Sequence, residues 1–162
     1  MLAADPGASI ASIATEAGVD RRTVYRRFAN RDDLLAAIYE ARLTAIEDAI
    51  EEARLCEAPV AVALHRYVEN IIVVNRIWPV DLPRMLADDS VHARRDAAIH
   101  AVDAFLQRAT DEGLMRPGLA EGWASALLPQ LMHLVNQQLP ELSPGQAADV
   151  VVDTLLNGLG TS

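Results

Sequence analysis

The sequence is short of several residue types, and each shortage excludes a class of protein. Its 162 residues include one cysteine, Cys56, which excludes an intramolecular disulfide framework and a Cys-x-x-Cys metal site. Aromatic residues make up only 4% of the chain, fewer than a β-sandwich or barrel ordinarily contains. The longest aliphatic run, residues 71–74, is far too short to span a membrane. Because no signal peptide is apparent either, we expect a cytoplasmic protein.

Lysine is absent, and the charge of the chain is strongly acidic. The 14 basic residues are all arginine and stand against 23 acidic residues, so the net charge is −9. An acidic average argues against nucleic acid as a partner. The charge is unevenly distributed, however, because residues 1–43 contain six arginines and six acidic residues, and residues 18–31 contain five arginines and one aspartate. This short segment therefore has a net charge of +4, while the whole excess of acid lies after residue 43.

Alanine and leucine are abundant, with 28 and 20 residues, and both favour helices. Apolar residues recur at helical spacing, and predicted caps precede the helices at Ser9, Asp20, Asn30, Ser90 and Ser143. We therefore predict an all-α protein. The predicted helices cover residues 10–17, 21–28, 30–55, 59 to just before Trp78-Pro79, a short segment near 82–87, 91–112, 120–139 with a kink at Pro129, and 143–159.

Residues 9–31 read SIASIATEAGVDRRTVYRRFANR and predict a helix-turn-helix unit. Its two short helices are joined by a turn of about three residues that contains Gly18, the spacing typical of this motif. In the second helix, Val24 and Phe28 lie four residues apart and form an inner face, so its polar side chains point outward. Arginine can donate to guanine edges and phosphates, and hydroxyl groups commonly contact phosphates. The pattern favours binding of double-stranded DNA over the alternative, a solvated arginine-rich helix face.

This segment resembles the tetracycline-repressor (TetR) family of bacterial regulators. The matching motifs are IA-x-x-AGV at residues 13–19, TVYRRF at 23–28 and NR-x-x-LL at 30–35, within a resemblance that extends over about residues 2–38. It implies a helix-turn-helix DNA-binding domain in residues 1–43 and a helical effector-binding and dimerisation domain in residues 44–162. Together, the resemblance and the outward-facing pattern predict DNA contacts from Ser9, Arg21, Arg22, Thr23, Tyr25, Arg26, Arg27 and Arg31.

The family ordinarily has a full amphipathic helix before this motif, and only residues 1–4 resemble part of one here. In relatives that helix covers the positions of Ile10, Ile13 and Phe28. We expect either that an upstream reading frame encodes about four more helical turns, or that the numbering starts at a later residue. The remaining alternative is a degenerate DNA-binding head, which would leave a helical ligand-binding or adaptor protein that does not bind DNA.

The resemblance also implies a small-molecule effector, which we expect to be largely apolar and to bind among the middle helices. The candidate lining residues are Tyr67, Asn75, Trp78, Met85 and Phe105. For each of them the alternative is an ordinary core residue. Asn75 in particular continues an apolar stripe, where its amide group needs a hydrogen-bond partner.

The last two long helices resemble the dimerisation bundle of the family, so we predict a homodimer held by an isologous four-helix contact. The predicted interface residues are Trp123, Leu127, Leu131, Leu134, Val151, Leu155 and Leu159. Two-fold symmetry implies a palindromic operator, with one recognition helix in each of two major grooves. We expect the effector to change the spacing of the two heads through the helix at 30–55, and thereby to release a repressor from DNA.

Catalytic and metal-binding patterns are weak in this chain. His92, Asp96 and His100 recur every four residues, a spacing that can bind a divalent metal. Their stripe lies to one side of the apolar face of that helix, so we predict a solvated surface and keep a metal-dependent helical enzyme as a third alternative. The sequence contains no glycine-rich phosphate loop and no G-x-S-x-G motif. We therefore expect no enzymatic activity, no cofactor and no resident metal.

Overall fold

The computed structural model describes residues 9–78 and 89–158, which form seven helices and no strand. This confirms the prediction of an all-α protein. The helices are α1 (Ile10–Glu16), α2 (Arg21–Arg27), α3 (Arg31–Ala53), α4 (Val60–Ile77), α5 (Asp89–Asp111), α6 (Trp123–Gln138) and α7 (Pro144–Asn157). The short helix predicted near residues 82–87 lies outside the described residues. None of the seven helices is long and apolar enough to cross a membrane.

Short polar side chains begin several helices at the predicted places. Asp20 Oδ1 accepts a hydrogen bond from the backbone N–H of Arg22 at 2.7 Å and starts α2. Asn30 Oδ1 accepts one from the N–H of Asp33 at 2.9 Å and starts α3. Ser143 begins α7 with a capping box. Its hydroxyl oxygen accepts a hydrogen bond from the N–H of Gln146, and the side-chain oxygen of Gln146 accepts one from the N–H of Ser143. Each cap provides an acceptor for an N–H group that the first helical turn leaves without one.

Two predicted helix starts were wrong. The helix α5 begins at Asp89, so Ser90 lies within its first turn and does not precede the helix. The helix α6 begins at Trp123 and not at residue 120, because Gly122 has a φ of 72°. Helical backbone cannot continue through a residue in this left-handed region. Pro129 lies inside α6, as the sequence predicts.

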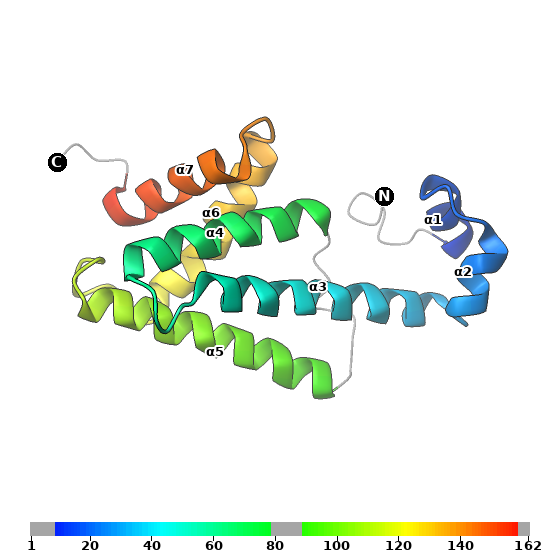
Figure 1. Cartoon of the computed structure of the whole chain (residues 1–162), viewed down its shortest axis with the longest axis horizontal. Helices are drawn as coiled ribbons and strands as arrows, with labels where there is room; N and C mark the ends of the chain where they lie inside the picture. The colour runs from blue at the N-terminus through cyan, green and yellow to red at the C-terminus, as the bar shows by residue number, and fades with distance from the viewer. Residues whose placement is uncertain (1–8, 79–88, 159–162) are drawn as a thin grey trace.

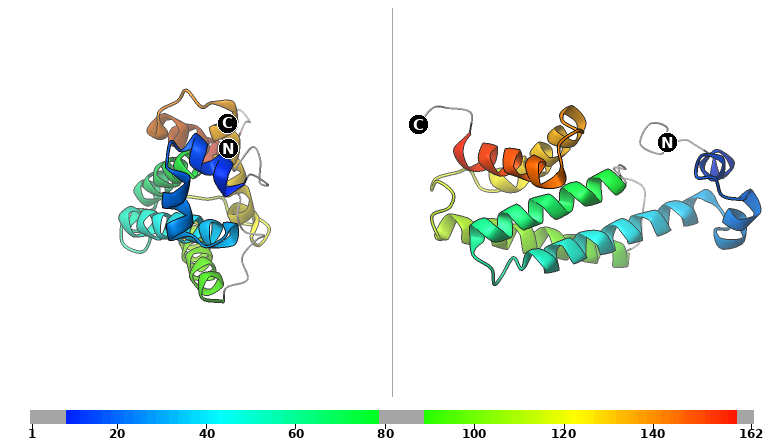
Figure 2. Two further views of the ribbon diagram at one scale, coloured as in Figure 1. Left: turned by 90° about the vertical axis from the view of Figure 1, so that its right-hand side faces the viewer. Right: turned by 45° about the horizontal axis from the view of Figure 1, so that its top comes forward.

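The helices α1 and α2 form a small head at one end of the molecule, and α3 joins this head to the body (Figure 1). The helices α4 and α5 run alongside the body half of α3, while α6 and α7 pack against α4 (Figures 1 and 2). The centre of the core is α4, whose Leu64, Val68 and Ile72 have exposed fractions of 0%. Because α3 runs without a break across residues 43 and 44, the arm that carries the head is continuous with the core.

A second, smaller apolar cluster lies nearer the head. Leu35, Tyr39 and Leu43 on α3 pack with Val91 on α5, and none of the four belongs to the main core. We call these four residues the head-side cluster. Each of them is no more than 6% exposed. The head-side half of α3 is thus attached to the body by its own set of buried contacts.

The loop between α3 and α4 is held by Arg108 on α5. Its Nη2 donates to Ala58 O at 2.8 Å, and its Nη1 donates to Cys56 O at 3.2 Å. We expect Arg108→Ala to lower the free energy of unfolding by about 1–3 kcal/mol, because it leaves these loop carbonyls without their donors. Chemical denaturation measures the loss. The control is Arg116→Ala, which changes an exposed arginine in the loop between α5 and α6 and should lower the free energy of unfolding by less than about 0.5 kcal/mol. Equal losses in the two variants would contradict the role of Arg108.

Candidate nucleic-acid interface

The unit formed by α1, the turn and α2 has the geometry that the sequence predicts. Ser9 Oγ accepts a hydrogen bond from the N–H of Ser12 at 3.1 Å and caps α1. At the turn, the N–H of Val19 donates to Ala14 O at 3.0 Å. Gly18 has a φ of 65°, a left-handed conformation that residues with a side chain rarely adopt. The glycine therefore helps to set the direction in which α2 faces.

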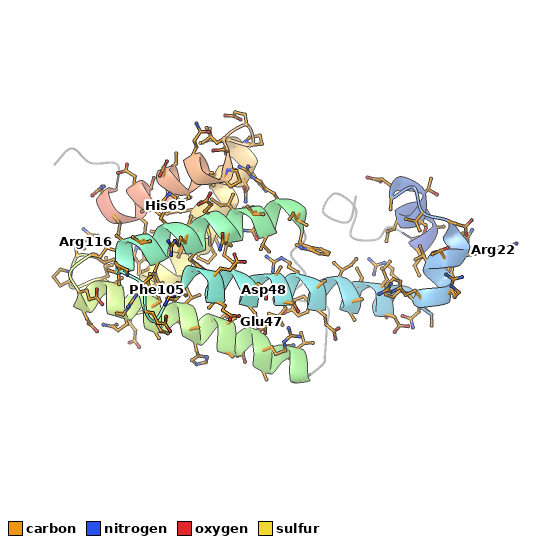
Figure 3. The ribbon with its side chains drawn as sticks, in the orientation of Figure 1. Arg22, Glu47, Asp48, His65, Phe105 and Arg116 are labelled. Atoms are coloured by element: carbon orange, nitrogen blue, oxygen red, sulfur yellow. The ribbon has the colours of Figure 1, made fainter. Side chains whose placement is uncertain are left out.

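The helix α2 presents its arginines to solvent. Val24 and Phe28 are half-buried and attach this segment to the head, as their spacing predicts. The other side chains of the helix are exposed, namely Arg21, Arg22, Thr23, Tyr25, Arg26 and Arg27. Arg22 projects away from the rest of the molecule at the outer end of the head (Figure 3). Six of the eight predicted DNA-contacting residues therefore lie together on one exposed helix.

The positive charges of α2 remain available for a partner. Among the residues that the structure describes, neither Arg22 nor Arg26 forms an ion pair. The guanidinium of Arg21 lies 5.4 Å from the ring centre of Tyr25, a contact that orients the side chain and leaves its charge unneutralised. Guanidinium and hydroxyl groups on one helix face can donate to phosphate oxygens and to base edges in a major groove.

Ser9, which precedes α1, and Arg31, which starts α3, are engaged within the protein. The hydroxyl group of Ser9 caps α1 and lies 3.0 Å from Ser12 Oγ. Arg31, the first residue of α3, is half-buried and interacts within the chain. A DNA phosphate would have to compete with these internal contacts, so both assignments stay predictions.

Asp32 and Asp33 lie in the first turn of α3, but the acidic residues of its body half lie well away from α2. Glu47 and Asp48 are on the body half of α3 (Figure 3), followed by Glu51 and Glu52. Glu47 is 16 residues from the start of α3 at Arg31, which is about 24 Å along a helix. This distance exceeds the Debye length of about 10 Å at moderate salt. The acidic body therefore does not cancel the positive potential around α2.

Two of the predicted effector-site residues lie deep in the main core. Tyr67 is 7% exposed and Phe105 is 2% exposed. Phe105 lies at the α3–α4 loop, because the guanidinium of Arg108, 5.6 Å from its ring centre, also donates to Ala58 O. Asn75 is 15 residues beyond the start of α4, about 22 Å from the loop end of that helix. Within the described residues, Phe105 and Asn75 therefore do not line one common site.

The remaining candidates lie toward the head. Trp78 is half-buried and directly follows α4, and Met85 lies outside the described residues. Asn75 is half-buried on the last turn of α4. Whether these residues contact an effector stays a prediction.

Asn75 and Tyr67 share a neighbour, Arg42, that the sequence pattern did not single out. Arg42 Nη2 donates to Asn75 Oδ1 at 3.0 Å between α3 and α4, which provides the partner that Asn75 needs. Burial raises the pKa of Tyr67 to about 12, and the charge of Arg42 partly opposes this rise. Tyr67 is therefore a neutral phenol near pH 7. A helical pattern could have found Arg42, since it follows Tyr39 by three residues and precedes Ile46 by four on the apolar stripe of α3.

The predicted dimer face contains exposed and buried residues. Trp123 and Leu134 on α6 are each 54% exposed, a large fraction for apolar side chains of this size. Half-buried members are Leu127, Leu131 and Leu155. Val151 is 1% exposed and packs in the core of its own chain, so its assignment to the interface was wrong. Val150, which is 41% exposed, has the outward position instead, and Leu159 lies outside the described residues.

The histidine stripe of α5 does not form a metal site in the described part of the chain. His100 Nδ1 lies 2.7 Å from the backbone oxygen of Asp96. The carboxylate of Asp96 accepts a hydrogen bond from Arg95 Nη2 at 3.0 Å. Residues 9–78 and 89–158 contain no group of three or more His, Cys, Asp or Glu side chains that could hold a metal ion.

Known proteins with a similar sequence have the same helix-turn-helix head. Residues 6–38, which include α1, α2 and the start of α3, match the family described as bacterial regulatory proteins, tetR family. The chain is 33% identical over 164 residues to the HTH-type transcriptional repressor LfrR of Mycolicibacterium smegmatis (strain ATCC 700084 / mc(2)155). This alignment covers 99% of the chain and 85% of the repressor.

Solved structures extend the similarity to the whole fold. The crystal structure of the TetR-like transcriptional regulator LfrR from Mycobacterium smegmatis in complex with proflavine matches with a TM-score of 0.73 and 29% identity, over 100% of this chain and 92% of that chain. The TetR family transcriptional regulator PfmR from Thermus thermophilus shares the fold, with a TM-score of 0.75 at 19% identity over 96% and 91% of the two chains. The chain therefore belongs to the tetR family of bacterial regulatory proteins and is a DNA-binding transcriptional regulator, not an enzyme.

Proposed function

We propose that the chain is a homodimeric repressor that binds a palindromic operator through α2 and releases it when a small molecule binds to the body. The observation that carries this proposal is the exposed face of α2, which α3 holds outside the body. Residues 1–43 would form the DNA-binding domain, and residues 44–162 the effector and dimer domain. The relative LfrR is a transcriptional repressor, which supports repression as the mode of action. As a regulator that binds DNA, the protein would act in the cytoplasm.

Exposed apolar side chains on α6 and α7 support the dimer. Trp123 and Leu134 are 54% exposed, and Val150 is 41% exposed. A two-fold contact between these helices would remove the same apolar patch of each copy from water. Two heads related by this symmetry would bind inverted half-sites about 34–36 Å apart.

The effector site is proposed to lie between α3 and α4, where Arg42 donates to Asn75 and its charge acts on Tyr67. These few polar groups lie beside a largely apolar core, the usual composition of a small-molecule site. The arm α3 contributes Arg42 and also carries the head, so a ligand here could bias the position of the head. The complex of LfrR with proflavine supports a small-molecule effector.

Selection of duplexes from a random DNA pool by the full chain tests the proposal. We expect enrichment of an inverted repeat, with an affinity that falls steeply as the salt concentration rises. Addition of proflavine is expected to weaken this binding, as fluorescence anisotropy of the labelled duplex would show. Proflavine binding without enrichment of any DNA would instead support a helical ligand-binding or adaptor protein that does not bind DNA.

A further inference from the structure

The helix α3 is attached to the start of α5 by two kinds of contact. The first is the apolar head-side cluster. The second is a polar bridge from Arg94 of α5, whose Nε donates to Glu47 Oε1 at 2.9 Å. Arg94 Nη2 donates to Glu47 Oε2 and, at 3.0 Å, to Thr44 Oγ1. Arg94 is the sixth residue of α5, so both attachments lie in the first two turns of that helix.

These two contacts constrain α3 in different ways. Apolar packing is non-directional, so the head-side cluster holds α3 and α5 together but tolerates sliding and rotation. A guanidinium fork on a carboxylate fixes both distance and orientation. The hydrogen bond to Glu47 is the main cause that raises the pKa of Arg94, and the charge of Glu40 on the same helix as Glu47 adds to it. The bridge therefore sets the rotation and register of α3 against α5.

A small change in the rotation or register of α3 against α5 produces a larger displacement at the head. Only residues 28–30 separate α2 from α3, so α2 follows any movement of the arm. Arg31 is 16 residues from Glu47, about 24 Å along the helix. A tilt of about 5° at Glu47 therefore moves the start of α3 by about 2 Å, given this length. A displacement of that size changes how α2 meets a DNA groove.

We infer that Arg94 is a positioning residue of the DNA-binding head, because its bonds to Glu47 and Thr44 hold α3, and with it α2, at one setting against the body. The inference rests on the proposed function, since this setting matters for operator binding. It also identifies the first two turns of α5 as the part of the body that passes movement to the head. The side chains of Arg94 and Glu47 are 39% and 36% exposed, so their pairing contributes little to the stability of the fold.

Three variants of the full chain test this role: Arg94→Ala, Glu47→Ala and, as the matched control, Arg95→Ala. Arg95 is the next residue of α5, its side chain is 37% exposed, and its partner Asp96 lies on the same helix. Anisotropy measures affinity for the selected duplex, and thermal melting measures stability.

Electron paramagnetic resonance measures the distance from the head to α5. Spin labels are attached to Thr15→Cys on α1 and Ala104→Cys on α5, both exposed positions, in a Cys56→Ser background. Dilution with unlabelled protein isolates the distance within one chain. This readout reports the position of the head whether or not DNA is bound, and a merely stabilising ion pair would not change it.

We expect Arg94→Ala and Glu47→Ala each to broaden this distance distribution and to weaken DNA binding by about fivefold to tenfold. The reason is that α3 has the orientation that allows α2 to bind DNA in a smaller fraction of the molecules. The two variants change the net charge in opposite directions, so a shared loss cannot come from electrostatic attraction to DNA. Melting temperatures are expected to stay close to that of the wild type. Arg95→Ala is expected to match the wild type in all three measurements.

An unchanged distance distribution in Arg94→Ala would overturn the inference, as would opposite shifts of DNA affinity in the Arg94 and Glu47 variants. These results differ from a failure of the proposed function, in which the wild-type chain itself binds no duplex. In that case the spin-label distances alone decide whether Arg94 positions the head.

Discussion

Replacing Arg22 and Arg26 together with alanine is expected to weaken operator binding by roughly a hundredfold or more, at about 1–3 kcal/mol for each base-contacting arginine. The two residues lie four positions apart on the exposed face of α2, and neither forms an ion pair in residues 9–78 and 89–158. The slope of log affinity against log salt is expected to fall by about one for each phosphate interaction that the substitutions remove. Anisotropy titrations at several salt concentrations measure both quantities.

The matched control for this variant is Arg66→Ala together with Arg116→Ala. Both residues are exposed, and they lie on α4 and in the loop after α5, so the net charge changes equally without touching the head. Arg116 lies at the end of the molecule opposite Arg22 (Figure 3). We expect this control to bind DNA within about threefold of the wild type, because exposed charges beyond a Debye length are largely screened. Similar losses in the two double variants would show that α2 does not make the contacts assigned to it.

Introducing a carboxylate at Leu134 is expected to dissociate the dimer, with the dissociation constant raised by roughly a thousandfold. Leu134 is 54% exposed on α6, where the proposed two-fold contact would bury it. Full burial of a leucine side chain contributes about 1.5–3 kcal/mol, and symmetry counts the residue twice. Because only the exposed 54% of this side chain remains to be buried, the two copies together contribute about 1.6–3.2 kcal/mol. At 1.4 kcal/mol for each tenfold change in affinity, the lost burial accounts for about 10-fold to 200-fold, and the cost of burying two carboxylates provides the rest. Analytical ultracentrifugation of Leu134→Glu measures the change.

Ile99→Glu is the control for this second prediction. Ile99 on α5 is 49% exposed and lies outside the proposed interface, so the same charge is introduced at an apolar surface residue of similar size and exposure. We expect Ile99→Glu to remain a dimer and to keep its operator affinity. Far-ultraviolet circular dichroism checks that both variants keep their helices. Dissociation of the Ile99 variant with a stable Leu134 dimer would place the interface on α5 instead.

Much of the head could be predicted because its determinants are local. Asp20 and Asn30 cap the helices that follow them, through N–H groups two or three residues along the chain. Gly18 provides the left-handed turn, and the spacing of Val24 and Phe28 decides which face of α2 is turned inward. A turn or a cap depends on a few neighbouring residues, so the pattern of the sequence is sufficient to find it.

The effector candidates were harder to place, because a pocket is assembled from distant segments. An apolar stripe shows that Tyr67 and Phe105 face inward, and both are buried. It does not show their position along the bundle, and Phe105 lies at the α3–α4 loop whereas Asn75 lies near the other end of α4. The prediction that Val151 lies on the dimer face was wrong for a related reason. Neighbouring helix positions differ by about 100°, so only the packing of α7 on α4 decides that Val150 and not Val151 faces outward.

The sequence by itself determined the helical fold class, the helix-turn-helix head and the arginine-rich face of α2, since short-range spacing and local charge specify each of them. Only the tertiary structure decided which polar residues meet between helices. Arg42 and Asn75 are 33 residues apart, and Arg94 and Glu47 are 47 residues apart. Contacts at such separations depend on how α3 packs against α4 and α5, which no local pattern specifies. The head is thus a local property of the chain, whereas the attachment that positions it belongs to the packed body.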